Sequence, residues 1–413
     1  MARANHALEP TARAWIMARA AAQRGRWADD ISDRIGRGRN MERRTLSRRD
    51  VLRVLSSAAL GAATAPSVAL SGQGVSELPP EGTFELGNLS LESGGVLPKA
   101  RIGYRTHGRL NAARSNAILY PTPFPAQHRD IEWLIGPGKA LDPDHRFIIV
   151  VDQLGNGLSS SPSNTAEPLD RMRFPTVTIR DDVAAQHQLV TSGFGIQRLS
   201  LVTGWSMGAQ QTFQWAVSHP DMVERIAPFC GTATTTPHNA VFLQGVRAAL
   251  TADSAWMDGN YENQPAKGVA AAARVYAGWA FSQPFYKQGL YRQLGVASLE
   301  DFLESRWVPG FARRDANNML SMIRTWQLND VGATPGFGGS HERALRAIRA
   351  KATVIAGQTD MYFTAADIEE DAAFIPGARF QVIPSLWGHM AGAGLNPADS
   401  QFIEQEIKAL LAT

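Results

Sequence analysis

Short, unbroken apolar runs alternate with helical spacing along two parts of the chain. The apolar runs stand at 117–120, 147–151, 199–202, 352–356 and 380–383, and the helical spacing at 181–191, 207–218, 342–349 and 400–411. Unbroken apolar runs are typical of strands that are covered on both faces. Strands that alternate with helices predict a mostly parallel sheet flanked by helices.

The pattern differs before and between these two parts. Apolar and polar residues alternate from Phe84 to Glu92, with Gly94-Gly95 following, which predicts antiparallel edge strands within 82–98. Residues 100–107 predict a third strand. Residues 232–338 show helical periodicity and several tryptophans, so we expect a helical cap inserted into a core made of 80–231 and 339–413.

Composition fits a globular protein, with 44% hydrophobic and 19% charged residues. The net charge of +3 is unevenly spread, because residues 1–53 hold thirteen arginines and six acidic residues. Residues 54–413 therefore hold 28 basic and 32 acidic residues. This mildly acidic remainder argues against a nucleic-acid partner. Cys230 is the single cysteine, and no cluster has metal-ligand spacing, so we expect no metal and no cofactor.

The arginine-rich start resembles an export signal. Ser47-Arg48-Arg49-Asp50-Val51-Leu52 precedes a weakly apolar run and small residues up to Ala69, an order typical of twin-arginine leaders. The run is too short to span a membrane. We expect residues 1–70 to be a disordered leader and the protein to be periplasmic or secreted. Met41 is a candidate for the true start. The alternative is a disordered arm on a cytoplasmic protein.

Gly204-Trp205-Ser206-Met207-Gly208 stands between an apolar run and a helix. A strand that turns at once into a helix forces strained backbone angles on its central residue, and the flanking glycines allow close approach of neighbouring chain. This G-x-S-x-G pattern is typical of a nucleophile elbow, which predicts Ser206 as a nucleophile at a helix N-terminus.

A serine hydroxyl needs a base, and the base needs an acid that holds its tautomer. Asp360 and His389 each follow a late apolar run, so both are expected at the sheet edge where the elbow emerges. Asp367 and Asp371 are alternative acids in a helical stretch expected to point away. The other histidines weighed for this role, His128, His187, His219 and His341, are expected to be surface or capping residues.

An acyl-transfer intermediate also needs two backbone N–H donors. Met207, directly after the nucleophile, is the first expected donor. The second should come from the segment Pro121-Thr122-Pro123-Phe124-Pro125, where proline offers no N–H. Thr122 and Phe124 remain, and we choose Phe124.

Several motifs together resemble the homoserine O-acetyltransferase family of the α/β-hydrolase superfamily. They include Leu110–Ala117, Leu134–Asp142, Phe174–Asp181, the elbow, and Arg314-Asp315-Ala316-Asn317. The resemblance implies an α/β-hydrolase fold, acyl transfer through a serine ester, and a homodimer. It also implies that Arg274 binds the carboxylate of the acceptor, for which a guanidinium is suited; the alternative is a surface arginine.

The sequence departs from that family at two places. The family's catalytic histidine is followed by an aspartate that binds the acceptor's amino group, whereas Met390 stands here, and a thioether cannot pair with an ammonium. The family's oxyanion segment is replaced by residues 122–126. We therefore expect hydrolysis of a small or medium ester, with O-acetyl transfer from acetyl-CoA to a homoserine-like alcohol as the alternative. A non-catalytic binding protein on the same scaffold is a second alternative.

Overall fold

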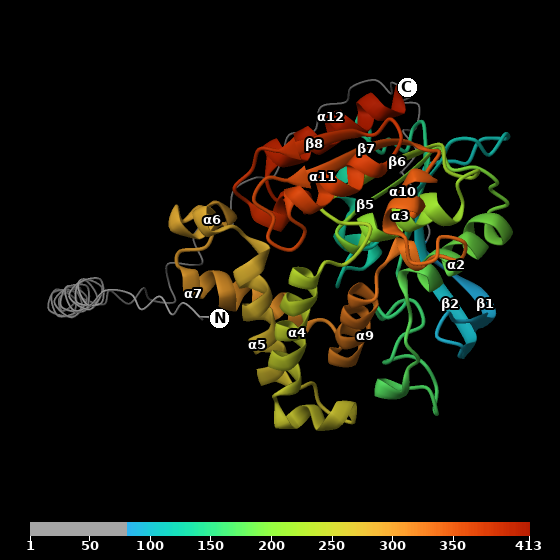
Figure 1. Ribbon diagram of the computed structural model, residues 1–413. Helices are drawn as coiled ribbons and strands as arrows, with labels where there is room; N and C mark the ends of the chain where they lie inside the picture. The colour runs from blue at the N-terminus through green and yellow to red at the C-terminus, as the bar shows by residue number, and fades with distance from the viewer. Residues whose placement is uncertain (1–80) are drawn as a thin grey trace, which may run out of the picture. The chain divides into compact units, whose positions relative to one another are not determined.

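Eight strands form one sheet in the computed structural model, which describes residues 81–413 (Figure 1). The strands are β1 (Glu81–Ser90), β2 (Val96–His107), β3 (Ala117–Pro121), β4 (Phe147–Val151), β5 (Leu201–Trp205), β6 (Arg225–Phe229), β7 (Lys351–Gly357) and β8 (Arg379–Ile383). Their order is β1-β2-β4-β3-β5-β6-β7-β8. Strands from β4 to β8 in this order run parallel, while β2 is antiparallel to both β1 and β4.

The apolar central strands are buried, as their composition predicts. Every residue of β3 and of β4 is buried, as expected for apolar runs between two layers of helices. β7 is buried after its first residue, Lys351. The mostly parallel sheet confirms the predicted fold class.

The prediction of three antiparallel edge strands is wrong in one respect. β2 is a single strand from Val96 to His107, so the expected break before residue 100 does not occur. Pro98 is tolerated because β2 pairs with β4 only through Tyr104 to His107. Opposite Pro98 the strand faces β1 alone, where the pairing is irregular, so the missing N–H leaves no central ladder broken.

Helices follow the strands in chain order. They are α2 (Ile179–Gln188), α3 (Met207–Ser218), α4 (Pro237–Thr251), α5 (Ala266–Ala280), α6 (Gln283–Lys287), α7 (Leu299–Phe302), α8 (Val308–Ala312), α9 (Ala316–Gln327), α10 (His341–Arg346), α11 (Ala365–Phe374) and α12 (Pro397–Leu411). Local signals set several starts: the Thr178 hydroxyl caps α2, and Thr236 caps α4 ahead of Pro237.

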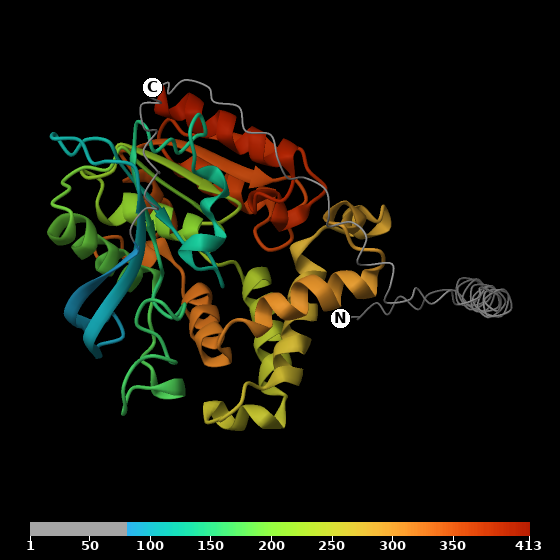
Figure 2. The ribbon, with the colours of Figure 1, turned by 180° about the vertical axis from the view of Figure 1, so that it is seen from behind.

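The segment between β6 and β7 consists mainly of helices, and its residues 232–338 are called the helical insertion below. Figures 1 and 2, seen from opposite sides, both show α4, α5 and α9 gathered beyond one end of the strands. The helical insertion belongs to the same compact unit as the sheet. Its buried residues Tyr276 and Trp326 are part of the common hydrophobic core.

Three loops leave the carboxyl ends of parallel strands at that same edge. Ser206 follows β5, Asp360 follows β7, and His389 follows β8. Parallel strands bring residues that are far apart in sequence to one edge of a sheet, where α/β proteins build their sites.

None of the helices in the described part of the chain has the length and apolar character needed to span a membrane. The expected leader, with Arg48 and Arg49, lies outside the described residues.

Candidate active site

Ser206 sits at a sharp turn from β5 into α3. Its backbone has φ 59° and ψ −124°, a conformation that costs an L-residue free energy and that clusters at functional sites. The Ser206 N–H donates to the carbonyl oxygen of Phe229 at 3.1 Å. The turn is therefore held by the neighbouring strand β6.

Both glycines of the elbow allow contacts that a side chain would block. A Cβ on Gly204 would lie 2.4 Å from the carbonyl carbon of Gly208. A Cβ on Gly208 would lie 2.6 Å from the carbonyl oxygen of Pro121. The start of α3 therefore packs directly against the end of β3.

His389 and Asp360 form a buried pair. Nδ1 of His389 lies 2.7 Å from Oδ2 of Asp360, and the two side chains are 1% and 0% exposed. Asp360 Oδ1 accepts hydrogen bonds from the backbone N–H groups of Tyr362 at 2.8 Å and Phe363 at 3.1 Å. A carboxylate with its acceptors filled in this way holds the imidazole in one orientation.

The loops that carry the pair are joined to each other. Thr359 Oγ1 donates to the carbonyl oxygen of Ser385 at 2.9 Å and accepts from the Gly388 N–H at 3.1 Å. His389 lies in the short helical turn η9 (Gly388–Gly392). The acid and the base are thus set by one hydrogen-bonded assembly at the ends of β7 and β8.

Aromatic rings bring the elbow to the histidine. The indole of Trp205, the residue before Ser206, stacks on the His389 imidazole with centroids 4.9 Å apart and planes 26° apart. Ser206 Oγ and His389 Nε2 are both buried, and neither has a hydrogen-bond partner among residues 81–413. The two atoms are therefore not hydrogen-bonded to each other.

Of the backbone N–H groups considered as oxyanion donors, one already makes a hydrogen bond within the protein and two do not. The Thr122 N–H donates to the carbonyl oxygen of Val151 at 2.9 Å, so Thr122 cannot serve an oxyanion. The N–H groups of Phe124 and of Met207, the first residue of α3, make no hydrogen bond within 81–413. Of the donors considered from the sequence, Met207 and Phe124 therefore remain unbonded within 81–413, and Thr122 does not.

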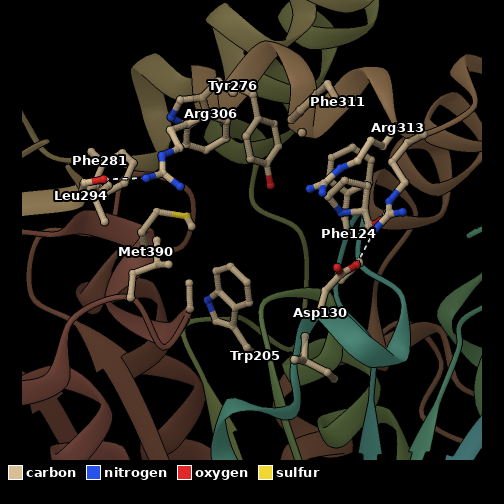
Figure 3. Close-up of a pocket in the computed structure, with 18 of the residues that line it drawn as sticks. Phe124, Asp130, Trp205, Tyr276, Phe281, Leu294, Arg306, Phe311, Arg313 and Met390 are labelled. Atoms are coloured by element: carbon tan, nitrogen blue, oxygen red, sulfur yellow. Dashed lines mark hydrogen bonds and ion pairs between the residues drawn. The ribbon is translucent and has the colours of Figure 1, made fainter. Parts of the chain in front are cut away.

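A cavity of about 370 Å³ lies between the helical insertion and the sheet edge. Its walls are mainly aromatic and aliphatic: Phe124, Trp205, Tyr276, Phe281, Phe302, Trp307, Phe311 and Met390. Figure 3 shows Trp205 and Met390 on the core side and Tyr276 and Phe311 on the side of the insertion. Ser206 and His389 do not line the cavity themselves; Phe124, Trp205 and Met390, which do, come from the segments that carry the candidate site.

The arginines that line the cavity do not include Arg274, which was expected to bind the acceptor. Arg274 is 42% exposed on α5, forms an ion pair with Glu304, and does not line the cavity. The structure therefore does not place it where it could bind an acceptor. Arg306, Arg313 and Arg314 line the cavity instead. Arg314 belongs to a motif quoted above, whereas nothing in the sequence pattern singled out Arg306.

Arg314 connects the helical insertion to the loop after β3. It donates to the carbonyl oxygen of Pro125 at 2.9 Å and to Gln127 Oε1 at 3.2 Å, and it pairs with the Asp130 carboxylate. The loop of Phe124 is thus tied to α9 and its neighbours. Arg314 therefore lines the cavity and also fixes the position of the loop that contributes Phe124.

The expectation of a surface or capping role is wrong for His128, which is 5% exposed. Its Nδ1 lies 2.6 Å from Asp152 Oδ2, and its Nε2 lies 3.4 Å from Glu81. Burial lowers the pKa of His128, but the bonds to these carboxylates outweigh it and raise that pKa overall. The loop after β3 folds over the end of β4, which buries the ring.

The alternative acids are occupied elsewhere. Asp371 lies 2.7 Å from His341 Nε2 and accepts from the Ala233 N–H at 2.7 Å. The Asp367 carboxylate accepts a hydrogen bond from the Thr364 hydroxyl at 2.7 Å, at the start of α11. These contacts leave Asp360 as the acid that reaches His389.

Cys230 is fully buried at the end of β6. Burial, together with the charge of Asp360, raises the pKa of its thiol well above the usual range. It is therefore a neutral thiol in the core rather than a second nucleophile. Within 81–413 no group of three or more histidine, cysteine or acidic side chains could hold a metal ion.

Comparison with known proteins of similar sequence or fold shows the family to which the chain belongs. Residues 126–392 match the family described as alpha/beta hydrolase fold. An ethyl acetate hydrolase from Pseudomonas veronii is 41% identical over 330 residues, covering 78% of this chain and 93% of the relative. A homoserine O-acetyltransferase from Trichormus variabilis is 32% identical over 320 residues, covering 73% and 86%.

The solved structure of the acetyl esterase MekB superposes with a TM-score of 0.79 at 38% identity, covering 81% of this chain and 97% of the esterase. The family match over residues 126–392 includes the helical insertion and the loops that carry Asp360 and His389. They confirm the resemblance inferred from the motifs. The chain belongs to the α/β-hydrolase family, in the branch that contains acetyl esterases and homoserine O-acetyltransferases.

Proposed function

We propose that this protein is a serine esterase that hydrolyses a small ester, with Ser206 as nucleophile, His389 as base and Asp360 as the acid that orients the base. The observation that carries the proposal is the buried His389–Asp360 pair at 2.7 Å, whose free Nε2 lies on the ring that Trp205 stacks upon. Ser206 is the next residue along the chain.

The reaction would proceed in two halves. Ser206 Oγ attacks the ester carbonyl carbon while His389 Nε2 takes the hydroxyl proton, and the tetrahedral intermediate collapses as His389 returns that proton to the departing alcohol. Water then attacks the acyl-Ser206 ester, giving its proton to His389. The acid is released, and the proton returns to Ser206.

The developing oxyanion would be held by the Met207 and Phe124 N–H groups. Both donors are free of other partners in the described chain, and Met207 begins α3, whose dipole favours negative charge at that end. Donors that are fixed before the reaction cost no reorganisation when charge develops. No metal is required for this chemistry.

The helical insertion would act as a cap that selects the substrate. A cavity of about 370 Å³ with aromatic walls suits a small apolar ester. The names of the similar esterases, an ethyl acetate hydrolase and an acetyl esterase, support acetyl as the acyl group.

Water is proposed as the acceptor because of Met390. This residue lines the cavity directly after His389, and a thioether offers an amino-acid acceptor no charge to pair with its ammonium. Arg274, which would bind the carboxylate of such an acceptor, is turned away and paired with Glu304.

Steady-state rates with p-nitrophenyl acetate test this function. We expect turnover by the wild type and a fall in kcat of about 10³-fold or more in Ser206→Ala, since the nucleophile is lost. Adding acetyl-CoA and homoserine should not release CoA. Homoserine-dependent CoA release would favour the transferase, and equal rates for both proteins would remove Ser206 from the mechanism.

We further propose that Arg48 and Arg49 direct export of the protein as part of a twin-arginine leader, from the order of charged, apolar and small residues after them. Cell fractionation of the full chain with the pair intact or changed to lysine tests this. Export of both forms, or retention of both, would count against it.

A homodimer is proposed from family resemblance alone, and the mass of the protein in solution tests it.

A further inference from the structure

Gln211 joins the two segments that carry the proposed oxyanion donors. Its side-chain Nε2 donates to the carbonyl oxygen of Met207 at 3.1 Å and to that of Thr122 at 3.0 Å. Met207 is itself a proposed donor, and Thr122 lies two residues before Phe124, the other donor. One side-chain amide therefore links the start of α3 to the loop after β3.

The orientation of this amide is fixed from behind. Gln211 Oε1 accepts from Gln186 Nε2 at 2.6 Å, and Gln186 Oε1 accepts from Trp215 Nε1 at 2.7 Å. Each of the three side chains is fully buried. A reversed Gln211 amide would place its oxygen against two carbonyl oxygens, so the chain of donors and acceptors permits one arrangement.

Thr122 is held at its other polar groups as well. Its N–H donates to the carbonyl oxygen of Val151 at 2.9 Å, and its Oγ1 accepts from the Gln153 N–H at 3.1 Å. These bonds tie Thr122 to β4. Gln211 is the contact that ties it to α3, and so it connects one donor segment to the other.

We propose that Gln211 is a positioning residue for the oxyanion site, setting the separation of the Met207 and Phe124 N–H groups without touching substrate. This inference rests on the function proposed above. Stabilisation of an oxyanion depends on donors that are already in place, and a small displacement of one donor weakens it steeply. The ester itself binds the aromatic walls, so its ground-state binding does not depend on Gln211.

The test replaces Gln211 with methionine, which keeps the length of the side chain and removes its hydrogen bonds. The control is Gln214→Met, because Gln214 is equally buried on the same helix but bonds to Ser218 and Thr334, away from the loop. In Gln211→Met we expect kcat for p-nitrophenyl acetate to fall roughly 10- to 100-fold with KM within about twofold. Affinity for a boronic acid that mimics the tetrahedral intermediate should fall by a similar factor.

Gln214→Met should lose comparable thermal stability and keep kcat. Wild-type kcat in Gln211→Met, or equal losses of kcat in both variants, would overturn the inference. If Gln211→Met does not fold, Gln186→Met replaces it, since Gln186 bonds to Gln211 and Trp215 and reaches the two donor segments through Gln211. Unchanged kcat in Gln186→Met would also count against the proposal.

Hydrogen exchange separates this inference from the esterase itself. Backbone amides within 122–127 should exchange faster in Gln211→Met than in wild type or Gln214→Met, whether or not the ester is turned over. A wild type without esterase activity rejects the proposed function, and in that case unchanged exchange at 122–127 rejects the role of Gln211 separately.

Discussion

The side chains around His389 decide what it can do. Trp205 stacks on one face of the imidazole, and Tyr362 and Phe363 lie against it with centroids 4.7 Å and 5.6 Å away. Asp360 fixes Nδ1, so the ring can neither rotate nor flip without displacing several aromatic side chains. This packing would hold Nε2 in one position for the role of base proposed above.

His219 gives the stability of the protein a dependence on pH. Burial, with a contribution from His187, lowers the pKa of His219 to about 4. Between the ordinary value near 6.5 and about 4, the unfolded chain binds a proton that the folded chain does not, so stability is lost as pH falls through this window.

We therefore expect His219→Phe, which keeps a ring beside His187 and Trp215, to lose less stability than wild type between pH 7 and pH 5. Urea unfolding at both pH values measures this. Identical falls in the free energy of unfolding would show that His219 does not titrate as described.

At the scale of elements, the site depends on how closely α3 approaches β3. Gly208 makes this approach possible, since a Cβ there would meet the Pro121 carbonyl oxygen at 2.6 Å. Gln211, one turn later, then reaches Thr122. The helix start is thus placed by backbone contact and held by a side-chain amide.

Gly208→Ala should push α3 away from β3. We expect a loss of about 1–3 kcal/mol in the free energy of unfolding and a fall in kcat, because the Met207 N–H moves with the helix. Gly278→Ala is the matched control: Gly278 is an exposed glycine of α5 with nothing near its missing Cβ, and it should gain up to about 1 kcal/mol. Urea unfolding and steady-state rates compare the two, and equal stability would contradict the packing argument.

Most of the helices and strands could be predicted from the sequence, because the signals that specify them are local in the chain. β3, β4 and β7 are apolar runs because both of their faces are covered, and the elbow is a short motif with its own backbone geometry. The prediction divided β2 wrongly at Pro98. Pro98 is tolerated because the strand faces β1 alone at that point, and this pairing is set by the tertiary structure. The burial of His128 was missed for the same reason, since it depends on Asp152 at the end of β4.

At the scale of the whole molecule, the sheet supplies the candidate chemistry and the helical insertion supplies the cavity. Tyr276 and Phe311 come from the insertion, and Trp205 and Met390 come from the sheet edge. No local pattern predicts which insertion residues meet the edge, so Arg306 could not be foreseen. Of the two interpretations of Arg274, its exposure and its ion pair with Glu304 fit the surface arginine. The contact between Asp360 and His389 could be predicted because chain order and the carboxyl edge of the sheet constrain where both residues lie.

Covalent labelling with a fluorophosphonate tests the central claim most directly, because the reagent reacts with a serine only when a base and an oxyanion site activate it. Mass spectrometry of the labelled protein should show one label, on the peptide that contains Ser206, and none in Ser206→Ala. Asp360→Asn should label far more slowly. A wild type that stays unlabelled, or a label carried on another residue, would contradict the triad of Ser206, His389 and Asp360.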